Sequence, residues 1–277
     1  MPDASWPMPV LRMRSATTES STDLPETRDA FHRGRFWLLQ PKGRGHRSGT
    51  DAMMLAAAVP SGFAGHLADL GAGAGAAGLA VAARCTGARV TLVERDGEMV
   101  EFARRSLLLK ENADLARRAD ILQADVTLAG RTRIAAGLAD NRFGFAIMNP
   151  PFNDVRDRAT DDSLRRAAHV MDAGLIEAWV RTAVAIVRPR GGFAAILRPH
   201  LLTDLLASVD GRFGALRIKP ILPRPGQDAA RIVVRGERGS RATLRIASPL
   251  VLHQAQGNSF TEEAEAVNNG AASLFAD

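Results

Sequence analysis

The sequence of 277 residues predicts an α/β fold with a doubly wound sheet that is mostly parallel and has an antiparallel edge strand. Short apolar runs alternate with helical patterns along most of the chain. The run His66–Leu70 leads into the glycine-rich loop Gly71–Gly75, and a helical pattern follows directly. A later apolar run ends at Asn149-Pro150-Pro151-Phe152, where two prolines stop the strand. These three features together predict the fold class.

We expect residues 31–277 to form one domain, because the alternation of elements is continuous there. Residues 31–60 form its first part, an extension with a strand at Phe36–Leu39 and a helix at Ala52–Ala58 that we expect to cover cofactor or substrate. The next elements are strands at His66–Leu70, Ala88–Val93, Ile121–Asp125, Phe143–Met148, Phe193–Leu197, Leu216–Leu222 and Ala230–Arg235, and helices at Ala76–Arg84, Glu98–Asn112, Ala173–Val187 and Leu201–Val209. Thr243–Ile246 is a candidate for an added edge strand, and the polar segment Asn153–Arg166 for a loop.

Composition separates the start of the chain from the rest. Residues 1–30 are rich in Pro, Ser, Thr and acids without periodicity, so we expect them to be disordered. The net charge is +6, which suits a polyanionic partner as well as a solvated basic surface. One cysteine, Cys85, excludes an intrachain disulfide, and no spaced His/Cys cluster predicts a metal site. The absence of a secretory signal or a bilayer-length apolar run predicts a cytoplasmic protein with no membrane contact.

Three acids follow or end three successive predicted strands, at the edge where open α/β sheets bind ligands: Asp69, Glu94 and Asp125. Glu94 can accept hydrogen bonds from both ribose hydroxyls, and Asp125 can bind an adenine amino group. The predicted cofactor site also includes the residues after these acids, Arg95 and Val126, and the glycines Gly71, Gly73 and Gly75. A loop before the first sheet strand ends in Thr50-Asp51, which either caps the next helix or covers the cofactor, with Asp51 meeting an ammonium group.

The segment Asn149-Pro150-Pro151-Phe152 predicts a grip for an amino group. The prolines hold the backbone extended, so the Pro150 carbonyl and the Asn149 amide oxygen can accept both hydrogens of one NH2 group. Phe152 offers a face on which a planar base can stack. The alternative is a proline-rich turn that closes the strand, with Phe152 covering the core. We therefore predict Asn149, Pro150, Pro151 and Phe152 as the catalytic residues, with Asn149 also adjoining the cofactor.

A basic segment lies ahead of these motifs. Its cations are interleaved with aromatic residues, as nucleic-acid binding favours, although a solvated basic hairpin explains the pattern equally well; they are Arg33, Arg35, Lys42, Arg44 and Arg47.

Two cofactor classes compete for the glycine loop. Gly73-Ala74-Gly75-Ala76-Ala77-Gly78 also fits the dinucleotide fingerprint, so an NAD(P)-dependent oxidoreductase is an alternative. The three acids and the amino-group grip favour S-adenosylmethionine instead.

With these motifs the chain resembles the class I S-adenosylmethionine-dependent methyltransferases, which have a Rossmann-like fold. Asp69–Gly75 is similar to their glycine-rich motif, and Asn149–Phe152 to the motif of members that methylate an amino group on a planar substrate. Gly49-Thr50-Asp51-Ala52 and Arg165-Arg166-Ala167-Ala168-His169 make it similar to the bacterial tRNA1(Val) adenine-N6-methyltransferase family, in which the fourth motif residue is often Tyr rather than Phe.

This resemblance implies methyl transfer to an exocyclic amino group of RNA, most simply adenine N6 in tRNA, with His169 near the substrate. The same motif occurs in enzymes that methylate guanine N2 in ribosomal RNA or glutamine N5 in protein, and these remain alternatives. A non-catalytic RNA-binding protein that keeps the fold is a further one.

Overall fold

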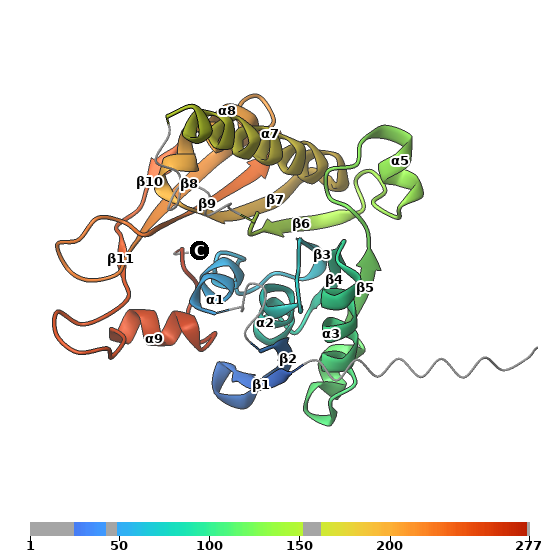
Figure 1. Ribbon diagram of the computed structural model, residues 1–277, viewed down its shortest axis with the longest axis vertical. Coiled ribbons are helices and arrows are strands. Elements are labelled where there is room, and N and C mark those ends of the chain that lie inside the picture. The colour runs from blue at the N-terminus through green and yellow to red at the C-terminus, as the bar shows by residue number, and fades with distance from the viewer. Residues whose placement is uncertain (1–24, 43–48, 152–161, 276–277) are drawn as a thin grey trace, which may run out of the picture.

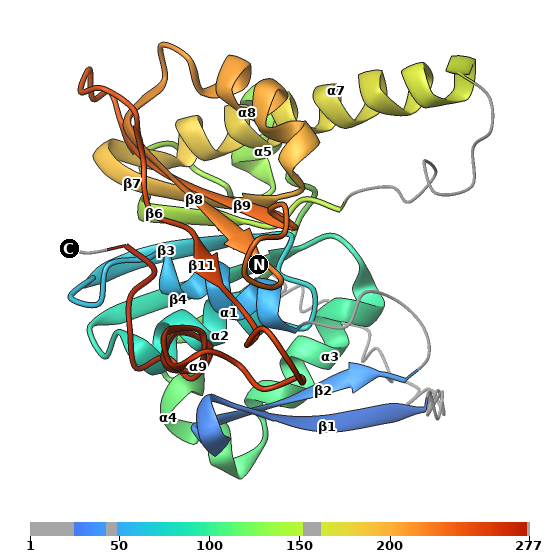
Figure 2. The same ribbon diagram turned by 90° about the vertical axis from the view of Figure 1, so that its left-hand side faces the viewer.

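The structure, a computed structural model, describes residues 25–42, 49–151 and 162–275. For residues 162–173 it describes the backbone alone. Within these ranges nine strands form one sheet, in the order β10-β8-β9-β7-β6-β3-β4-β5, with β11 paired to β8. Helices cover both faces of this sheet (Figures 1 and 2). The doubly wound α/β prediction is confirmed.

The first half of the chain builds a hairpin and one side of the sheet. The hairpin strands are β1 (Glu26–Phe31) and β2 (Phe36–Pro41), joined by the short helix η1 (His32–Gly34). The sheet strands are β3 (Gly65–Leu70), β4 (Ala88–Glu94), β5 (Ala119–Gln123) and β6 (Phe143–Met148). The helices are α1 (Thr50–Ala57), α2 (Ala76–Arg84), α3 (Gly97–Leu107), η2 (Lys110–Asn112), α4 (Ala113–Ala116) and α5 (Gly130–Ala135).

The second half completes the sheet on the other side of β6. Its strands are β7 (Val187–Leu197), β8 (Phe213–Leu222), β9 (Arg231–Arg238), β10 (Arg245–Ile246) and β11 (Leu250–Val251). Its helices are α7 (Asp162–Ile186), η3 (Pro199–Leu201), α8 (Leu202–Val209) and α9 (Glu262–Asn268). The antiparallel strand is β9, which lies between β7 and β8, and the outermost strand β10 runs parallel to β8.

Two apolar layers bury the faces of the sheet. One layer joins α1, α2 and α9 to the sheet and includes Met53, Leu79 and Phe275. The other joins α7 and α8 to it, with Trp179 and Leu205 as large members. The hairpin of β1 and β2 packs outside the first layer against α2 and α3, as Figure 2 shows. Burial on both faces explains the continuous apolar runs of the central strands.

Several local predictions need correction. The helix expected at Glu98–Asn112 ends at Leu107 and is followed by the separate helix η2, and the strand expected to end at Asp125 ends at Gln123. Strand β1 begins at Glu26, inside the segment expected to be disordered, because its residues pair along the whole length of β2. Helix α7 begins at Asp162, inside the expected loop, and continues to Ile186. Gly49 occupies the N-cap of α1, so neither Thr50 nor Asp51 caps that helix. None of the helices in the described ranges has the length and apolar character that a bilayer crossing requires.

Candidate active site

The strand order places the predicted motifs at the point where the sheet changes direction. From β3 the chain adds β4 and β5 on one side, and then returns to add β6 and β7 on the other. Leu70 of β3 pairs with Val93 of β4 and with Met148 of β6, so the glycine loop, Glu94 and Asn149 leave the sheet side by side. In open α/β sheets, ligands bind in the crevice at this change of direction.

The glycine loop needs two of its glycines for different reasons. Gly71 has a φ of +71°, and a Cβ there would overlap the indole ring of Trp179. Gly73 has a φ of +55°, and a Cβ there would meet no atom of the described residues within 4 Å. Gly71 therefore permits close packing of the loop against α7, whereas Gly73 leaves open space where a ligand can approach the backbone.

Glu94 is fixed by backbone donors. Its Oε2 accepts the Gly73 N–H at 2.8 Å, and its Oε1 accepts the N–H groups of Arg95 and Asp96 at 2.8 and 2.9 Å. A carboxylate has about four lone-pair sites, so about one remains for a ligand hydroxyl. The half-buried Glu94 carboxylate thus lies against the loop, with room for about one ribose hydroxyl rather than the two expected.

Asp69 lies beneath the loop rather than on its surface. Its residue is 2% exposed, and its Oδ2 accepts the Gly78 N–H in the first turn of α2 at 2.7 Å. Burial raises the pKa of Asp69 to about 7; the Gly78 hydrogen bond opposes this shift, and the charge of Glu94 adds to it. Asp69 therefore contacts the glycine loop and the N-terminal end of α2 rather than the ligand surface. A negative charge is stabilised at that end of a helix.

Asp125 ends the series of acids after β5. Its Oδ1 accepts hydrogen bonds from Thr127 N and Oγ1 at 2.8 and 2.7 Å, and its Oδ2 lies 3.7 Å from Arg95 Nη1. Burial raises the pKa of Asp125, but the Thr127 hydrogen bonds and Arg95 outweigh burial, so the pKa lies below its usual range. The carboxylate is thus held ionised beside Glu94. The next residue, Val126, is buried with α7.

Asn149 and the prolines follow β6 directly. Asn149 is half-buried, Pro150 is buried and Pro151 is exposed, so the segment turns outward at this point. The side chain of Asn149 makes no hydrogen bond to other residues in the described part of the chain. Its amide oxygen is therefore available to a ligand. Phe152, predicted to stack on the base, lies outside the described residues.

Asp51 meets a partner that lies 180 positions away in the sequence. The Arg231 Nε donates a hydrogen bond to Asp51 Oδ2 at 2.8 Å, and both side chains are half-buried. Arg231 is the first residue of β9, next to Ile232, which pairs with the end of β7. Asp51 and the neighbouring Thr50 therefore lie on the β7 side of the crevice. Local patterns gave no signal for Arg231, because its partner is distant in the chain.

The basic residues predicted to bind substrate are dispersed. Arg35 donates to the Ala83 carbonyl near the end of α2, and Arg33 pairs with Glu265 of α9, both far from the glycine loop. Lys42 is exposed at the end of β2. Arg44, Arg47 and the side chain of His169 lie outside the described residues. The structure does not bring Arg33 and Arg35 to Asn149, and RNA contact by these residues stays a prediction.

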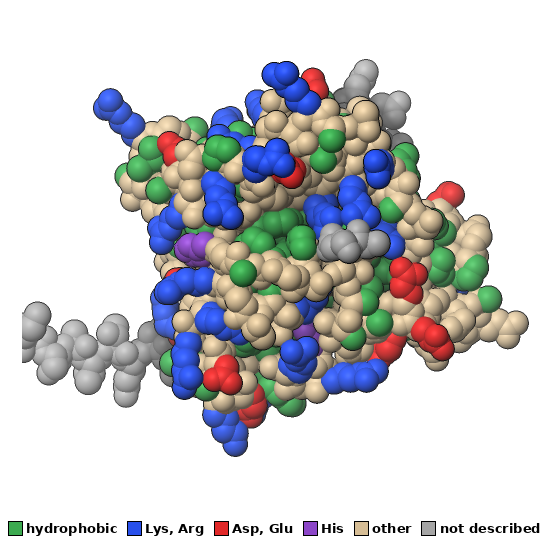
Figure 3. Space-filling model, turned by 180° about the vertical axis from the view of Figure 1, so that it is seen from behind, with side chains coloured by type: hydrophobic (Ala, Val, Ile, Leu, Met, Phe, Trp, Pro, Cys, Tyr) green, Lys and Arg blue, Asp and Glu red, His purple; other side chains and the backbone are tan. Residues whose placement is uncertain are grey.

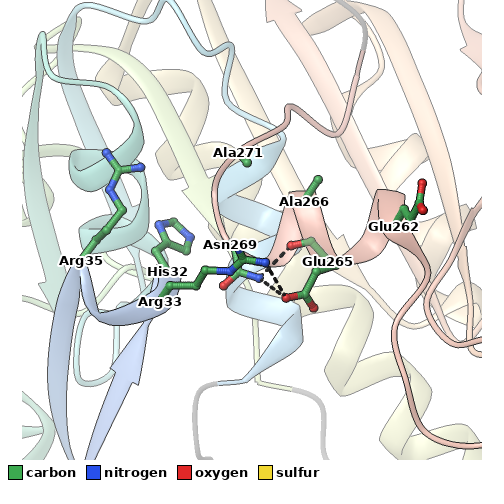
Figure 4. A pocket seen from close by; sticks show the side chains of 8 residues that line it. All are labelled: His32, Arg33, Arg35, Glu262, Glu265, Ala266, Asn269 and Ala271. Carbon is green, nitrogen blue, oxygen red and sulfur yellow. Dashed lines mark hydrogen bonds and ion pairs between the residues drawn. The ribbon is translucent and has the colours of Figure 1, made fainter.

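A pocket of about 450 Å³ opens beside Arg33 and Arg35 and is bordered by α9 (Figure 4). His32 lines it and is 3% exposed, and neither of its ring nitrogens has a hydrogen-bond partner among the described residues. Burial lowers the pKa of His32 to about 4, helped by the charges of Arg35 and Arg84, so the ring is neutral. This pocket is separate from the crevice at Asn149.

Comparison with known proteins finds methyltransferases whose names give different methyl acceptors. The model of the methyltransferase small domain family matches residues 47–177. A tRNA1(Val) (adenine(37)-N6)-methyltransferase from Porphyromonas gingivalis is 28% identical over 236 residues, which cover 83% of this chain and 89% of the relative. A crystal structure from Agrobacterium tumefaciens, described as a predicted O-methyltransferase, is 45% identical in sequence and superposes with a TM-score of 0.71. The match covers 81% of this chain and 98% of the Agrobacterium tumefaciens chain.

A more distant structure shares the fold alone. It is a Thermus thermophilus 16S rRNA N2 G1207 methyltransferase in complex with AdoMet and guanosine. Its sequence is 22% identical, its TM-score is 0.51, and the match covers 77% of this chain and 50% of the Thermus thermophilus chain.

Fold, crevice and relatives together define an enzyme of the S-adenosylmethionine-dependent methyltransferase class. Within that class, residues 47–177 match the methyltransferase small domain, and the chain is similar to the tRNA1(Val) adenine-N6-methyltransferases.

The donors at the glycine loop fit S-adenosylmethionine better than a dinucleotide. Two acids occupy N–H groups there: Glu94, at the end of β4, takes that of Gly73 in the loop, and the buried Asp69 takes that of Gly78 in the first turn of α2. A pyrophosphate on the loop would face the Glu94 carboxylate and find these two donors already used. A ligand with a sulfonium and an ammonium group meets complementary charge instead. The structure therefore argues against the NAD(P)-dependent alternative.

Proposed function

We propose that the protein transfers a methyl group from S-adenosylmethionine to an exocyclic amino nitrogen of RNA, namely adenine N6 in a tRNA. The observation that carries this proposal is the position of Asn149. It lies where the strand order changes direction, with the acids that suit the cofactor on the β4 and β5 side and the end of β7 on the other.

Asn149 and Pro150 would hold the amino group by both of its hydrogens. The ring of Pro151 disfavours helical backbone at Pro150, so the Pro150 carbonyl points in a defined direction. The cofactor supplies a methyl group that positive sulfur already activates. The task of the protein is then to orient the nitrogen and to accept its developing positive charge, which fixed acceptors do well.

This arrangement favours an amino group over a hydroxyl group as the methyl acceptor. A hydroxyl must lose its proton to a base during transfer, whereas an amide oxygen and a peptide carbonyl accept hydrogen bonds but do not take up a proton at neutral pH. The description of the Agrobacterium tumefaciens protein as a predicted O-methyltransferase makes this distinction worth testing.

The similarity to the Porphyromonas gingivalis tRNA methyltransferases supports tRNA as the substrate. Guanine N2 of ribosomal RNA and glutamine N5 of protein would present the same NH2 geometry to Asn149. They remain the alternatives that an experiment must separate, together with a role in RNA binding alone.

The test is transfer of label from tritiated S-adenosylmethionine into tRNA, ribosomal RNA and protein fractions from cells that lack this gene, followed by nucleoside analysis. We expect label in tRNA, recovered as N6-methyladenosine. Label recovered as N2-methylguanosine, as a 2′-O-methyl nucleoside or in protein would contradict the proposed acceptor. Tight cofactor binding without any label would indicate a binding role.

A further inference from the structure

We propose that the RNA binds along the part of the sheet edge beyond Asn149, on a surface built by the end of β7, the turn between β8 and β9, and the loop after β11. We call it the basic strip, and its cations and histidines are Arg198, His200, Arg224, Arg231 and His253. This inference rests on the proposed function and names the surface that serves it.

Strand direction brings these residues to one edge. Leu197, the last residue of β7, pairs with Ile232, and Arg231 pairs with Ile221 near the end of β8. Leu250 of β11 also pairs with Ile221 and runs parallel to β8. The ends of β7, β8 and β11 and the start of β9 therefore lie at the same edge as the end of β6, where Asn149 leaves the sheet.

Charge divides this edge into two parts. On the β4 and β5 side the half-buried side chains at the edge are Glu94 and Asp125. On the β7 side the basic strip contributes three guanidinium groups, of which that of Arg231 is paired with Asp51 of α1. The β8–β9 turn adds one carboxylate, Asp228, and the loop from 252 to 261 adds none. A polyanion that delivers a base to Asn149 is repelled from the first part and attracted to the second.

The strip is held in place before any ligand arrives. Arg224 donates to the Gln254 carbonyl at 2.8 Å and to Asn258 Oδ1 at 3.2 Å, which fastens the β8–β9 turn to the loop after β11. In that loop the rings of His253 and Phe260 stack at 4.8 Å with an angle of 15°. A preformed surface lowers the entropy cost of binding, and stacked rings suit unpaired bases.

Positive charge alone does not select this surface. Figure 3 shows Lys and Arg side chains over the opposite face of the molecule as well. Two of the exposed arginines near the amino ends of the strands are Arg89, paired with Asp120, and Arg190, paired with Glu237. They are separated from Asn149 by about 20 Å, the length of a six-residue strand. This distance makes Arg89 and Arg190 a good control.

The experiment compares two double variants that each remove two positive charges. Arg198→Gln/Arg224→Gln alters the strip, and Arg89→Gln/Arg190→Gln alters the opposite face. The Kd for tRNA from cells lacking this gene is measured across a series of KCl concentrations, with the Kd for S-adenosylmethionine as a check on the fold. His200→Glu, which touches neither of the Arg224 hydrogen bonds, is measured alongside in case the Arg224 substitution loosens the loop.

We expect the strip variant to bind tRNA about tenfold more weakly at 0.1 M salt, with the slope of log K against log salt reduced by about 1.4 for two phosphate contacts to an unpaired strand. His200→Glu should weaken binding in the same direction. The control variant should bind as the unaltered protein does, and all variants should keep their cofactor affinity.

Equal losses of tRNA affinity in both double variants, or a loss in the control variant alone, would contradict the proposal that RNA binds the basic strip. So would unaltered tRNA binding by Arg198→Gln/Arg224→Gln and His200→Glu in a protein that does methylate tRNA. Label in protein rather than RNA in the transfer assay would instead overturn the proposed function, so the two failures are distinguishable.

Discussion

Asp69 shows how one buried carboxylate holds the cofactor loop together. Its Oδ2 accepts the Gly78 N–H at 2.7 Å, and its burial leaves it without solvent to stabilise its charge. Its pKa of about 7 means that the folded protein can hold this proton near neutral pH, whereas the unfolded chain releases it near pH 3.8. The protonation of Asp69 is therefore linked to folding.

The sign of this linkage gives a prediction. Between about pH 4 and 7 the folded state binds more protons than the unfolded state, so the Asp69 contribution to the free energy of unfolding falls as pH rises. Asp69→Asn removes this contribution. The free energy of unfolding of the variant should therefore rise more steeply with pH than that of the unaltered protein, by up to about 1.4 kcal/mol per pH unit. Urea denaturation at pH 5 and pH 7 measures the difference, with the exposed Asp120→Asn as control. Parallel curves for the protein and Asp69→Asn would show that Asp69 is ionised throughout.

At the scale of elements, the glycine loop between β3 and α2 combines a packing requirement with an open ligand surface. Gly71 and Gly73 both have positive φ, but only Gly71 faces a neighbouring side chain, the indole of Trp179. The same substitution at these two positions therefore separates packing from ligand access.

Gly71→Ala should cost about 1–3 kcal/mol of stability more than Gly73→Ala, because both pay for left-handed backbone but only the first overlaps Trp179. Gly73→Ala places a methyl group in the open space above the loop, so we expect its cofactor affinity to fall about tenfold or more, a loss of about 1.4 kcal/mol or more. Thermal denaturation and calorimetric titration with S-adenosylmethionine measure the two effects. Unchanged cofactor affinity in a folded Gly73→Ala protein would place the ligand elsewhere.

The sequence was sufficient for the central elements but not for their distant contacts. β3, β4 and β6 agree closely with the predicted runs, because apolar stretches buried on both faces are visible locally. β1 was missed, since its alternating exposed and half-buried residues become a strand only through β2. The pair of Asp51 and Arg231 and the burial of Asp69 depend on tertiary packing, which local patterns do not encode.

At the scale of the whole molecule, one sheet edge separates two tasks. The β3, β4 and β5 side carries the acids that suit the cofactor, and the β7, β8, β9 and β11 side carries the basic strip. Asn149 lies between the two sides, at the end of β6. The net charge of +6 favours association with polyanions in general. If RNA is the substrate, as we propose, this division would determine the side from which it approaches.

The central claim is that Asn149 orients the amino nitrogen rather than holding the cofactor. The most direct test is to measure kcat and the Kd for S-adenosylmethionine in Asn149→Ala, with the RNA fraction that takes up label as substrate. We predict that kcat falls at least about 100-fold, as removal of one preorganised charge-stabilising group typically causes, while the Kd changes less than about threefold. Loss of cofactor binding with normal turnover of the remaining bound enzyme would contradict the account.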